Sequence, residues 1–276
     1  MKLVTWNSQW CCGLDGVVSP QRIVDGARQL ADFDVLCLQE IAQGYAGLPG
    51  APGDQPAQLA ALLPGYQLFF GAAVDELGVD GRRQRFGNLI ATRLPVLQVQ
   101  HHPLPWPADA GRISMPRMCT VLTLRDPQLG ALRVMTTHLE YYSTVQRMAQ
   151  ARALCELHAQ ACAMAAAPPA DDDPGSPFRA KVHTPLAILC GDFNLDASQP
   201  EHALIEAAGL RDAWRALYGA RPQDPTYSLF DHSYWPQPVT FDFVFVSAGL
   251  VSHLQRMWVD GQTRSSDHQP VALQLG

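Results

Sequence analysis

Short apolar runs alternate with amphipathic helical patterns along this 276-residue chain. The segments KLVTW and DVLCLQ, both in the first 40 residues, are typical of buried strands. Between them, Ser19 is a candidate N-cap, Pro20 suits a first helical turn, and apolar residues recur on one face. This spacing predicts a helix over about residues 20–32, so the chain opens with a strand, a helix and a strand.

The middle of the chain carries a series of β-type segments. We expect a helix over about residues 55–63, followed by strands at YQLFFGAAV, NLIATRL, VLQVQHHPL, RMCTVLTLR and ALRVMTTHL. Turn signals such as DPQLG separate these segments. Closely spaced strands with short turns favour antiparallel pairing.

Two capping boxes predict helices in the second half of the chain. Ser143-x-x-Gln146 predicts a long helix from about Thr144 to Ala166, and Ser198-x-x-Glu201 predicts a shorter one. The segments LAILC, TFDFVFVS and PVALQL are typical of strands.

The stretch AAAPPADDDPGSP, residues 165–177, lacks apolar anchors, and the expected loop around it covers about residues 166–181. We therefore expect a mobile surface loop there rather than a domain boundary. We interpret its acidic triplet at 171–173 as solvated rather than as a metal site.

Composition narrows the class of protein. The chain is 47% hydrophobic, which is enough for a sizeable core, and no linker divides it, so we expect a single domain over residues 1–276. The start MKLVTWNSQW has no signal-peptide pattern and no run of about 18 apolar residues occurs, which predicts a cytoplasmic protein without a transmembrane segment. We also expect a monomer. The net charge of −6 disfavours long duplex nucleic acid as a partner but allows a small phosphorylated substrate.

Polar residues recur where the expected strands end or begin. They are Asn7, Glu40, His138, Asp192 with Asn194, Asp242, and Asp267 with His268. Any one of them has an ordinary interpretation as a turn or cap residue. Together they predict one constellation at the rim of a sheet, where α/β folds tend to build their sites.

The residue types in this constellation point to metal-assisted phosphate chemistry. Its carboxylates and amides are hard oxygen ligands, which suit Mg²⁺ or Mn²⁺, and no Cys/His cluster suits structural Zn²⁺. The two histidines, His138 and His268, are candidates for proton transfer or for charge stabilisation. Phosphate-ester hydrolysis uses all of these parts at once.

The ordered series TWN, LCLQE, GNLIATRLP, TTHLE, GDFN, FDFVFVS and SSDHQPV resembles the endonuclease/exonuclease/phosphatase superfamily. The resemblance runs from Lys2 to Leu275. It implies an α/β (α+β) fold, namely a four-layer sandwich in which two mostly antiparallel sheets pack face to face with helices outside. It also implies a divalent-metal active site at one edge.

The resemblance implies a role for each matching residue. Asn7, Glu40 and Asp267 look like the metal-side residues, with Glu40 as a direct ligand of Mg²⁺ and Mn²⁺ as a possible substitute. Asp192 looks like the residue that aligns or deprotonates the attacking water, and Asn194 like a phosphate or water contact.

The histidines are carried over in the same way. His268 is similar to the histidine that contacts the scissile phosphate, and Asp242 to its orienting partner. His138 matches a position that holds histidine in the deoxyribonuclease and sphingomyelinase branches and tyrosine in the abasic endonucleases.

Other residues near these motifs are candidates with ordinary structural alternatives. They are Asn88, Arg117, the basic patch Arg82, Arg83 and Arg85, the tryptophans Trp10, Trp106 and Trp235, and the segment Glu140, Tyr141 and Tyr142. The last three follow THL and are expected near the mouth of the site.

Two functions follow from the sequence. The first is a metal-dependent hydrolase of phosphate esters, that is a phosphodiesterase, nuclease or phosphatase, acting on nucleic acid or a small phosphoester. The alternative is a catalytically silent protein that binds a phosphorylated ligand or a partner protein. The sequence does not name the substrate.

Overall fold

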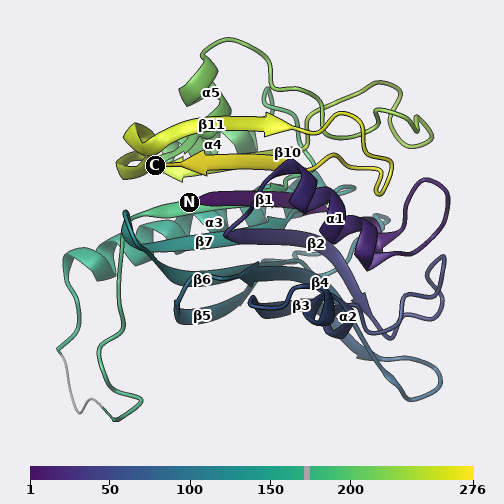
Figure 1. The fold of residues 1–276 in the computed structure, drawn as a ribbon, viewed down its shortest axis with the longest axis horizontal. Helices are drawn as coiled ribbons and strands as arrows, with labels where there is room; N and C mark the ends of the chain where they lie inside the picture. The colour runs from purple at the N-terminus through teal and green to yellow at the C-terminus, as the bar shows by residue number, and fades with distance from the viewer. Residues whose placement is uncertain (171–174) are drawn as a thin grey trace.

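The computed structural model describes residues 1–170 and 175–276. Within these residues the chain forms two six-stranded sheets that pack face to face, with helices on their outer sides (Figure 1). The acidic triplet at 171–173 lies outside the described residues. Within the described ranges, no helix combines the length and the apolar character needed to cross a bilayer.

The first sheet has the strand order β11-β12-β1-β2-β4-β3. The strands are β1 (Lys2–Asn7), β2 (Val35–Gln43), β3 (Gln67–Leu77), β4 (Arg83–Thr92), β11 (Leu254–Val259) and β12 (Val271–Leu275). Strands β1 and β2 are parallel and are connected through α1 (Pro20–Leu30), and the other neighbours in this sheet are antiparallel. A second helix, α2 (Gln55–Leu62), packs beside α1.

The second sheet has the strand order β5-β6-β7-β8-β10-β9. The strands are β5 (Val96–Pro103), β6 (Met118–Asp126), β7 (Gly130–His138), β8 (Ala187–Asp192), β9 (Leu210–Asp212) and β10 (Asp242–Ser247). Strands β7 and β8 are parallel and are connected through the long helix α3 (Thr144–Ala166). The remaining helices are α4 (Pro200–Ala207) and α5 (Ala213–Tyr218), with short 3-10 turns η1 (Gln9–Cys11) and η2 (Ala248–His253).

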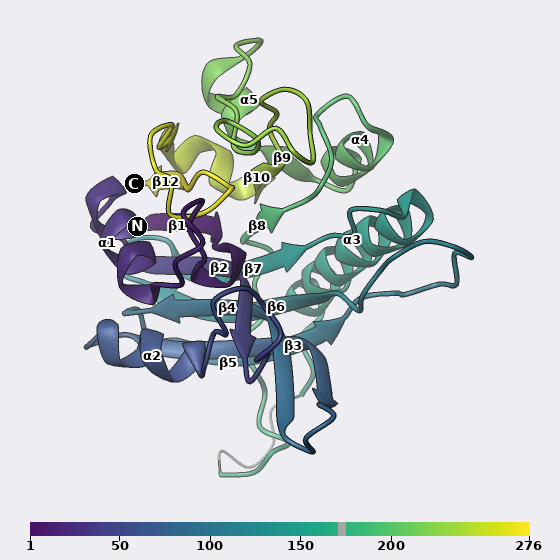
Figure 2. The same ribbon diagram turned by 90° about the vertical axis from the view of Figure 1, so that its right-hand side faces the viewer.

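Three apolar clusters separate the layers. One lies between the sheets, where Val35 and Ile90 of the first sheet meet Leu122 and Val134 of the second. The second cluster packs α1 and α2 onto the first sheet, and the third packs α3 and α4 onto the second. Figure 2 shows the two helix pairs on opposite sides of the sheets. The expected four-layer sandwich of mostly antiparallel sheets is confirmed.

The capping predictions are confirmed for two helices and wrong for a third. The Ser19 side chain accepts from the backbone N–H of Arg22, and the Ser143 side chain accepts from that of Gln146. Helix α4, by contrast, has Gln199 as its N-cap and no side-chain cap. Proline is favoured at the first helical position, so Pro200 starts this helix one residue later than a Ser198 cap would.

Residues from five strands, two in the first sheet and three in the second, meet at one edge of the molecule. In the first sheet the parallel register places Asn7 beside Gln39, the residue before Glu40. In the second sheet His138 of β7 pairs with Asp192 of β8, and Asp192 pairs with Asp242 of β10. The two sheets therefore bring most of the predicted polar residues to a common edge.

Candidate active site

His138, Asp192 and Asp242 form a row across three adjacent strands of the second sheet. Nε2 of His138 lies 3.4 Å from Oδ2 of Asp192. Nearly all of the surface of these three side chains is removed from water. A buried carboxylate requires hydrogen-bond donors or positive charge around it, and the first sheet supplies part of both.

Asn7 connects the two sheets at this edge. Its Nδ2 donates to Oδ2 of Asp192 over 2.9 Å and to Oε1 of Glu40 over 3.1 Å. Its Oδ1 accepts from the backbone N–H of Gln9 over 3.1 Å. The amide therefore holds two carboxylates, one from each sheet, at a fixed separation.

Glu40 and Asn194 adopt left-handed backbone conformations. Glu40 has φ 59° and lies in a bulge of β2, where the pairing with β4 shifts between Leu38 and Ile41. Asn194 has φ 51°. Such conformations cost of order 1 kcal/mol or more for a residue other than glycine and gather at functional sites. The bulge redirects the Glu40 side chain toward the site.

His138 is held as a neutral imidazole. Burial, together with the positive charge of Arg117, lowers its pKa well below the ordinary value. The Asn194 amide donates to Nε2 of His138 over 3.0 Å and to the carbonyl of Leu139 over 2.9 Å. Because Nε2 accepts, the proton resides on Nδ1, which lies 4.0 Å from Oε1 of Glu40.

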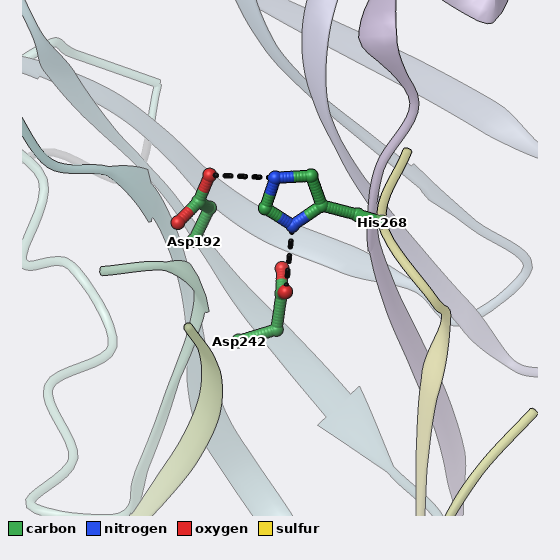
Figure 3. A group of neighbouring side chains, drawn as sticks. All are labelled: Asp192, Asp242 and His268. Atoms are coloured by element: carbon green, nitrogen blue, oxygen red, sulfur yellow. Dashed lines mark hydrogen bonds and ion pairs between the residues drawn. The ribbon is translucent and has the colours of Figure 1, made fainter. Parts of the chain in front are cut away.

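His268 has the opposite charge state. Burial opposes its protonation, but the charges of Asp242 and Asp192 raise its pKa to about 10. Nδ1 donates to Oδ2 of Asp242 over 2.8 Å, and Nε2 lies 3.6 Å from Oδ2 of Asp192 (Figure 3). The ring also contacts Tyr227, with the ring centres 4.6 Å apart. The site thus contains an imidazolium beside a carboxylate.

Two acidic side chains, Glu40 and Asp267, lie close enough at the first sheet for their charges to interact. Burial and the Asp267 charge raise the pKa of Glu40 to about 7. Burial also raises the pKa of Asp267. A cation between such carboxylates would relieve both effects, and oxygen donors are the ligands that Mg²⁺ and Mn²⁺ prefer. The donor set therefore fits a divalent ion of this type.

A second group of metal-ligand types lies next to the first. Ligand atoms of Asp192, Asp242 and His268 all lie within 4.8 Å of one another. Metal binding needs a neutral imidazole with a free nitrogen lone pair. Since His268 is held protonated by its two aspartates, this trio fits a proton-donating group better than a metal site.

An open cavity of about 330 Å³ lies over these groups. Its floor contains six of the eight predicted site residues, namely Glu40, His138, Asp192, Asn194, Asp267 and His268. Asp242 and Asn7 support this floor through their hydrogen bonds. All eight predicted residues are therefore brought together.

Aromatic side chains form the rim of this cavity. They are Trp10, Phe86, Tyr141, Tyr142, Tyr227 and Tyr234. Tyr142 and Tyr234 are exposed, and the rings of Tyr141 and Tyr142 meet edge to face with centres 4.8 Å apart. The expected position near the mouth is confirmed for Tyr141 and Tyr142, whereas Glu140 is fully buried and does not line the cavity. Trp106 and Trp235 are not among the residues that line this cavity.

A buried ion pair between Arg117 and Glu140 lies beside the cavity. The sequence named both residues as candidates but did not predict their contact. Nε of Arg117 donates to Oε2 of Glu140 over 3.1 Å, and the backbone N–H of Tyr142 donates to Oε1. Arg117 lines the cavity, and its buried Nη1 has no hydrogen-bond partner among the described residues. The two residues are 23 positions apart, and no local pattern connects them.

The other candidates have structural roles. Asn88 donates to the carbonyl of Met118 and so joins the two sheets. In the basic patch, Arg83 pairs with Asp75 and Arg82 lies near Asp80 in the exposed hairpin between β3 and β4. The interpretation of this patch as a solvated loop holds for Arg82 but is wrong for Arg83 and Arg85, which lie on β4. Arg85 is half-buried, and its Nε donates to Oε1 of Gln43.

Comparison with known proteins gives one family. Residues 4–268 match the model of the Endonuclease/Exonuclease/phosphatase family. A search among curated proteins found no match.

Solved structures give the same fold. An endonuclease/exonuclease/phosphatase from Beutenbergia cavernae DSM 12333 aligns over 100% of this chain and 72% of its own, with 25% identity and a TM-score of 0.72. A mannosyl-6-phosphatase from Bacteroides thetaiotaomicron VPI-5482 aligns over 100% and 99%, with 18% identity and a TM-score of 0.69. TDP2 from D. rerio, complexed with a single-strand DNA product, aligns over 100% and 98%, with 19% identity and a TM-score of 0.66.

Proposed function

The chain belongs to the endonuclease/exonuclease/phosphatase family, whose members hydrolyse phosphate esters, and we propose that it is a divalent-metal-dependent phosphoesterase. The observation that carries the proposal is the contact between Asp192 and the His268 imidazolium on the floor of the cavity. Asp192, a base for water, and His268, a cation for phosphate, then lie side by side at the same cavity.

Glu40 and Asp267 would hold the metal ion, which we take to be Mg²⁺ with Mn²⁺ as a substitute. When bound, the ion would neutralise negative charge on the phosphate and on its leaving oxygen. Asn7 would act indirectly, because its N–H groups face the carboxylates of Glu40 and Asp192 while its carbonyl oxygen is engaged by Gln9.

Asp192 is suited to orient or deprotonate the attacking water. Both of its oxygens are held, since Oδ1 accepts from the backbone N–H of Asn194 and Oδ2 from Asn7. Burial raises its pKa, while the neighbouring His268 opposes the shift. A carboxylate that is fixed in place and more basic than usual is a better acceptor for a proton from water.

His268 would stabilise the phosphate through Nε2–H. Asp242 fixes the ring and keeps it charged through Nδ1. The neutral His138, with Asn194 beside it, would contact the phosphate or the water from the opposite side. Arg117 lines the cavity, and its Nη1, which has no hydrogen-bond partner within the described part of the chain, would add an N–H donor there.

The substrate would carry a phosphate ester, in nucleic acid or in a small molecule. One structural relative is named a mannosyl-6-phosphatase and another holds single-strand DNA product. Nucleic acids and small phosphate esters are therefore both included in the test. We further propose that the chain acts in the cytoplasm as a monomer of one domain.

The proposal is tested by a hydrolysis screen with and without Mg²⁺ or Mn²⁺. The substrates are a model phosphodiester, single- and double-stranded DNA, RNA, phospholipids, inositol phosphates and sugar phosphates. Asp192→Ala and His268→Ala are the active-site variants. Asp196→Ala is the matched control, because Asp196 follows the same motif but caps an exposed turn through Ser198.

We expect metal-dependent turnover of at least one substrate, abolished by the two active-site substitutions and retained in Asp196→Ala. Thermal melts establish that each variant is folded. Turnover that survives both active-site substitutions would overturn the catalytic assignment. Metal-independent binding of a phosphorylated ligand without turnover would favour a silent binding protein.

A further inference from the structure

Arg133 on β7 is a buried cation without an acidic partner. Among the described residues, three arginines are buried. Arg117 pairs with Glu140 at 3.1 Å and Arg147 with Glu201 at 3.4 Å. No carboxylate of the described chain lies within 4.0 Å of Arg133. Buried charges are ordinarily paired because desolvation is costly, so Arg133 is the exception.

The contacts of Arg133 are all with neutral groups. Nε donates to the carbonyl of Thr184 over 3.2 Å, Nη2 donates to Nδ1 of His158 over 2.8 Å, and Nη1 contacts Sδ of Met135 at 3.7 Å. A guanidinium has five N–H donors, so two remain without a contact of this kind. Burial lowers the pKa of Arg133, and the neighbouring cysteines Cys162 and Cys119 offset this effect only in part.

A cavity of about 170 Å³ opens beside this guanidinium. It lies between the outer face of the second sheet, α3 and residues 182–184. Amide side chains of Gln98, Gln100 and Gln160 line it, and so does His183, whose buried Nε2 has no hydrogen-bond partner among the described residues. A cavity of about 150 Å³ holds a benzene-sized molecule, so a small ion and water fit here.

Strand register places the polar groups of this cavity in one row. Gln98 of β5 pairs with Thr123 of β6, which pairs with Arg133 of β7. Paired residues share a face of the sheet, and all three line the cavity.

The cavity is separate from the candidate active site. Arg133 and His138 are five residues apart on β7, so they lie on opposite faces and about 16 Å apart along the strand.

We propose that this cavity binds a small oxyanion, a phosphate or carboxylate group, through the Arg133 guanidinium. The planar guanidinium matches the two oxygens of such a group. The amides of Gln98 and Gln100 supply further N–H donors for the remaining oxygens. An anion at this position would pair the one buried arginine of residues 1–170 and 175–276 that has no acidic partner there, and it would connect α3 to the sheet.

In the first test, a substitution introduces a carboxylate into the protein near Arg133. Gln98→Glu puts a carboxylate in the same cross-strand row as Arg133, and Gln128→Glu is the control in the exposed turn after β6. We expect Gln98→Glu to raise the melting temperature by about 2 °C or more and the control to leave it unchanged. Equal melting temperatures in the two variants would contradict the proposal.

The second test measures anion binding directly. Inorganic phosphate and acetate are titrated by calorimetry in EDTA, and crystals soaked in selenate locate the anion. His268→Ala separates this cavity from the active site. We expect saturable binding that persists in His268→Ala and weakens at least about tenfold in Arg133→Met and Gln98→Glu.

The relative affinities of phosphate and acetate indicate which kind of anionic ligand the cavity binds. Tighter binding of phosphate points to a phosphorylated ligand and tighter binding of acetate to a carboxylate. Absence of saturable binding in His268→Ala, or selenate found only in the active site, overturns the proposal. Gln98→Glu keeps the test decisive if Arg133→Met does not fold.

Discussion

The hydrogen bond from Nδ1 of His268 to Oδ2 of Asp242, 2.8 Å long, connects the two sheets at the centre of the candidate active site. Asp242 begins β10 in the second sheet, and His268 lies just before β12 in the first. Asp242 is fully buried, so water screens its charge poorly. The bond therefore sets both the orientation of the imidazole and its protonated state.

Asp242→Asn is expected to reduce kcat/KM by about 10²-fold or more at pH 8. The substitution keeps the shape but removes the charge that helps to raise the pKa of His268 to about 10. The pKa of His268 then falls, so the imidazolium is lost at a lower pH than in the wild type. The kcat/KM of the variant should recover partly as pH is lowered toward 6. The pH profile and NMR titration of the ring measure both effects.

Asp212→Asn is the control for this substitution, because Asp212 is a buried aspartate that contacts another histidine, His202, over 3.0 Å. It should leave the pH profile unchanged. A constant ratio of kcat/KM between Asp242→Asn and the wild type across pH 6–9 would contradict the assigned role of Asp242.

Glu40→Gln is expected to raise the Mg²⁺ concentration for half-maximal activity by at least about tenfold, because it removes a proposed direct ligand. The wild type should lose activity in EDTA and regain it with Mg²⁺ or Mn²⁺. Glu76→Gln, in the exposed hairpin, is the control. An unchanged Mg²⁺ requirement in Glu40→Gln would remove Glu40 from the metal site.

Glu40→Gln should also make the metal-free protein more stable than the wild type at high pH. The pKa of Glu40 is about 7 in the folded state against 4.5 ordinarily, so the folded state binds more protons between these values. Its free energy of unfolding therefore falls by about 2–3 kcal/mol as pH rises from 5 to 8. Urea denaturation in EDTA should show this loss in the wild type and not in Glu40→Gln.

The strand-end pattern was sufficient to predict that the eight residues gather at one site, whereas the four-layer fold was predicted from the resemblance of the ordered motifs to a known superfamily. Asn7, His138 and Asp192 end strands whose apolar runs are visible in the sequence, and parallel pairing places such ends at one edge. The short elements β9, α5 and β11 were not predicted. Strand β9 has three residues and α5 has six, which is too short for a periodic pattern.

Features that depend on distant residues could not be predicted. The bulge that gives Glu40 its positive φ depends on where β4 shifts its pairing. The N-cap of α4 is Gln199 rather than the expected Ser198, because Pro200 occupies the first helical position. The burial of Arg117 and Arg133 depends on side chains brought over by other elements, and an arginine in a strand pattern does not reveal its partners.

Glu140→Gln is expected to destabilise the fold by about 3–5 kcal/mol, because it leaves the buried Arg117 without its partner. Arg117→Met should destabilise for the same reason, since Glu140 then keeps a buried charge. The double variant should recover much of the loss. Urea denaturation of all four proteins measures this coupling. Additive losses, with a coupling energy near zero, would show that the pair does not act as a unit.

His158 is expected to make the protein sensitive to mild acid. Burial, together with the charge of Arg133, lowers the pKa of His158 to about 4 from 6.5. Between these values the unfolded state binds a proton that the folded state does not, so the free energy of unfolding falls as pH falls. The loss in the free energy of unfolding between pH 7.5 and pH 5 is about 2 kcal/mol.

His158→Asn keeps an acceptor for Arg133 but cannot take up the proton, and it should lose this part of the pH dependence. His253→Asn, a substitution at the far edge of the first sheet, should keep it. Urea midpoints at the two pH values compare the three proteins, and an equal pH dependence in wild type and His158→Asn would contradict the assignment.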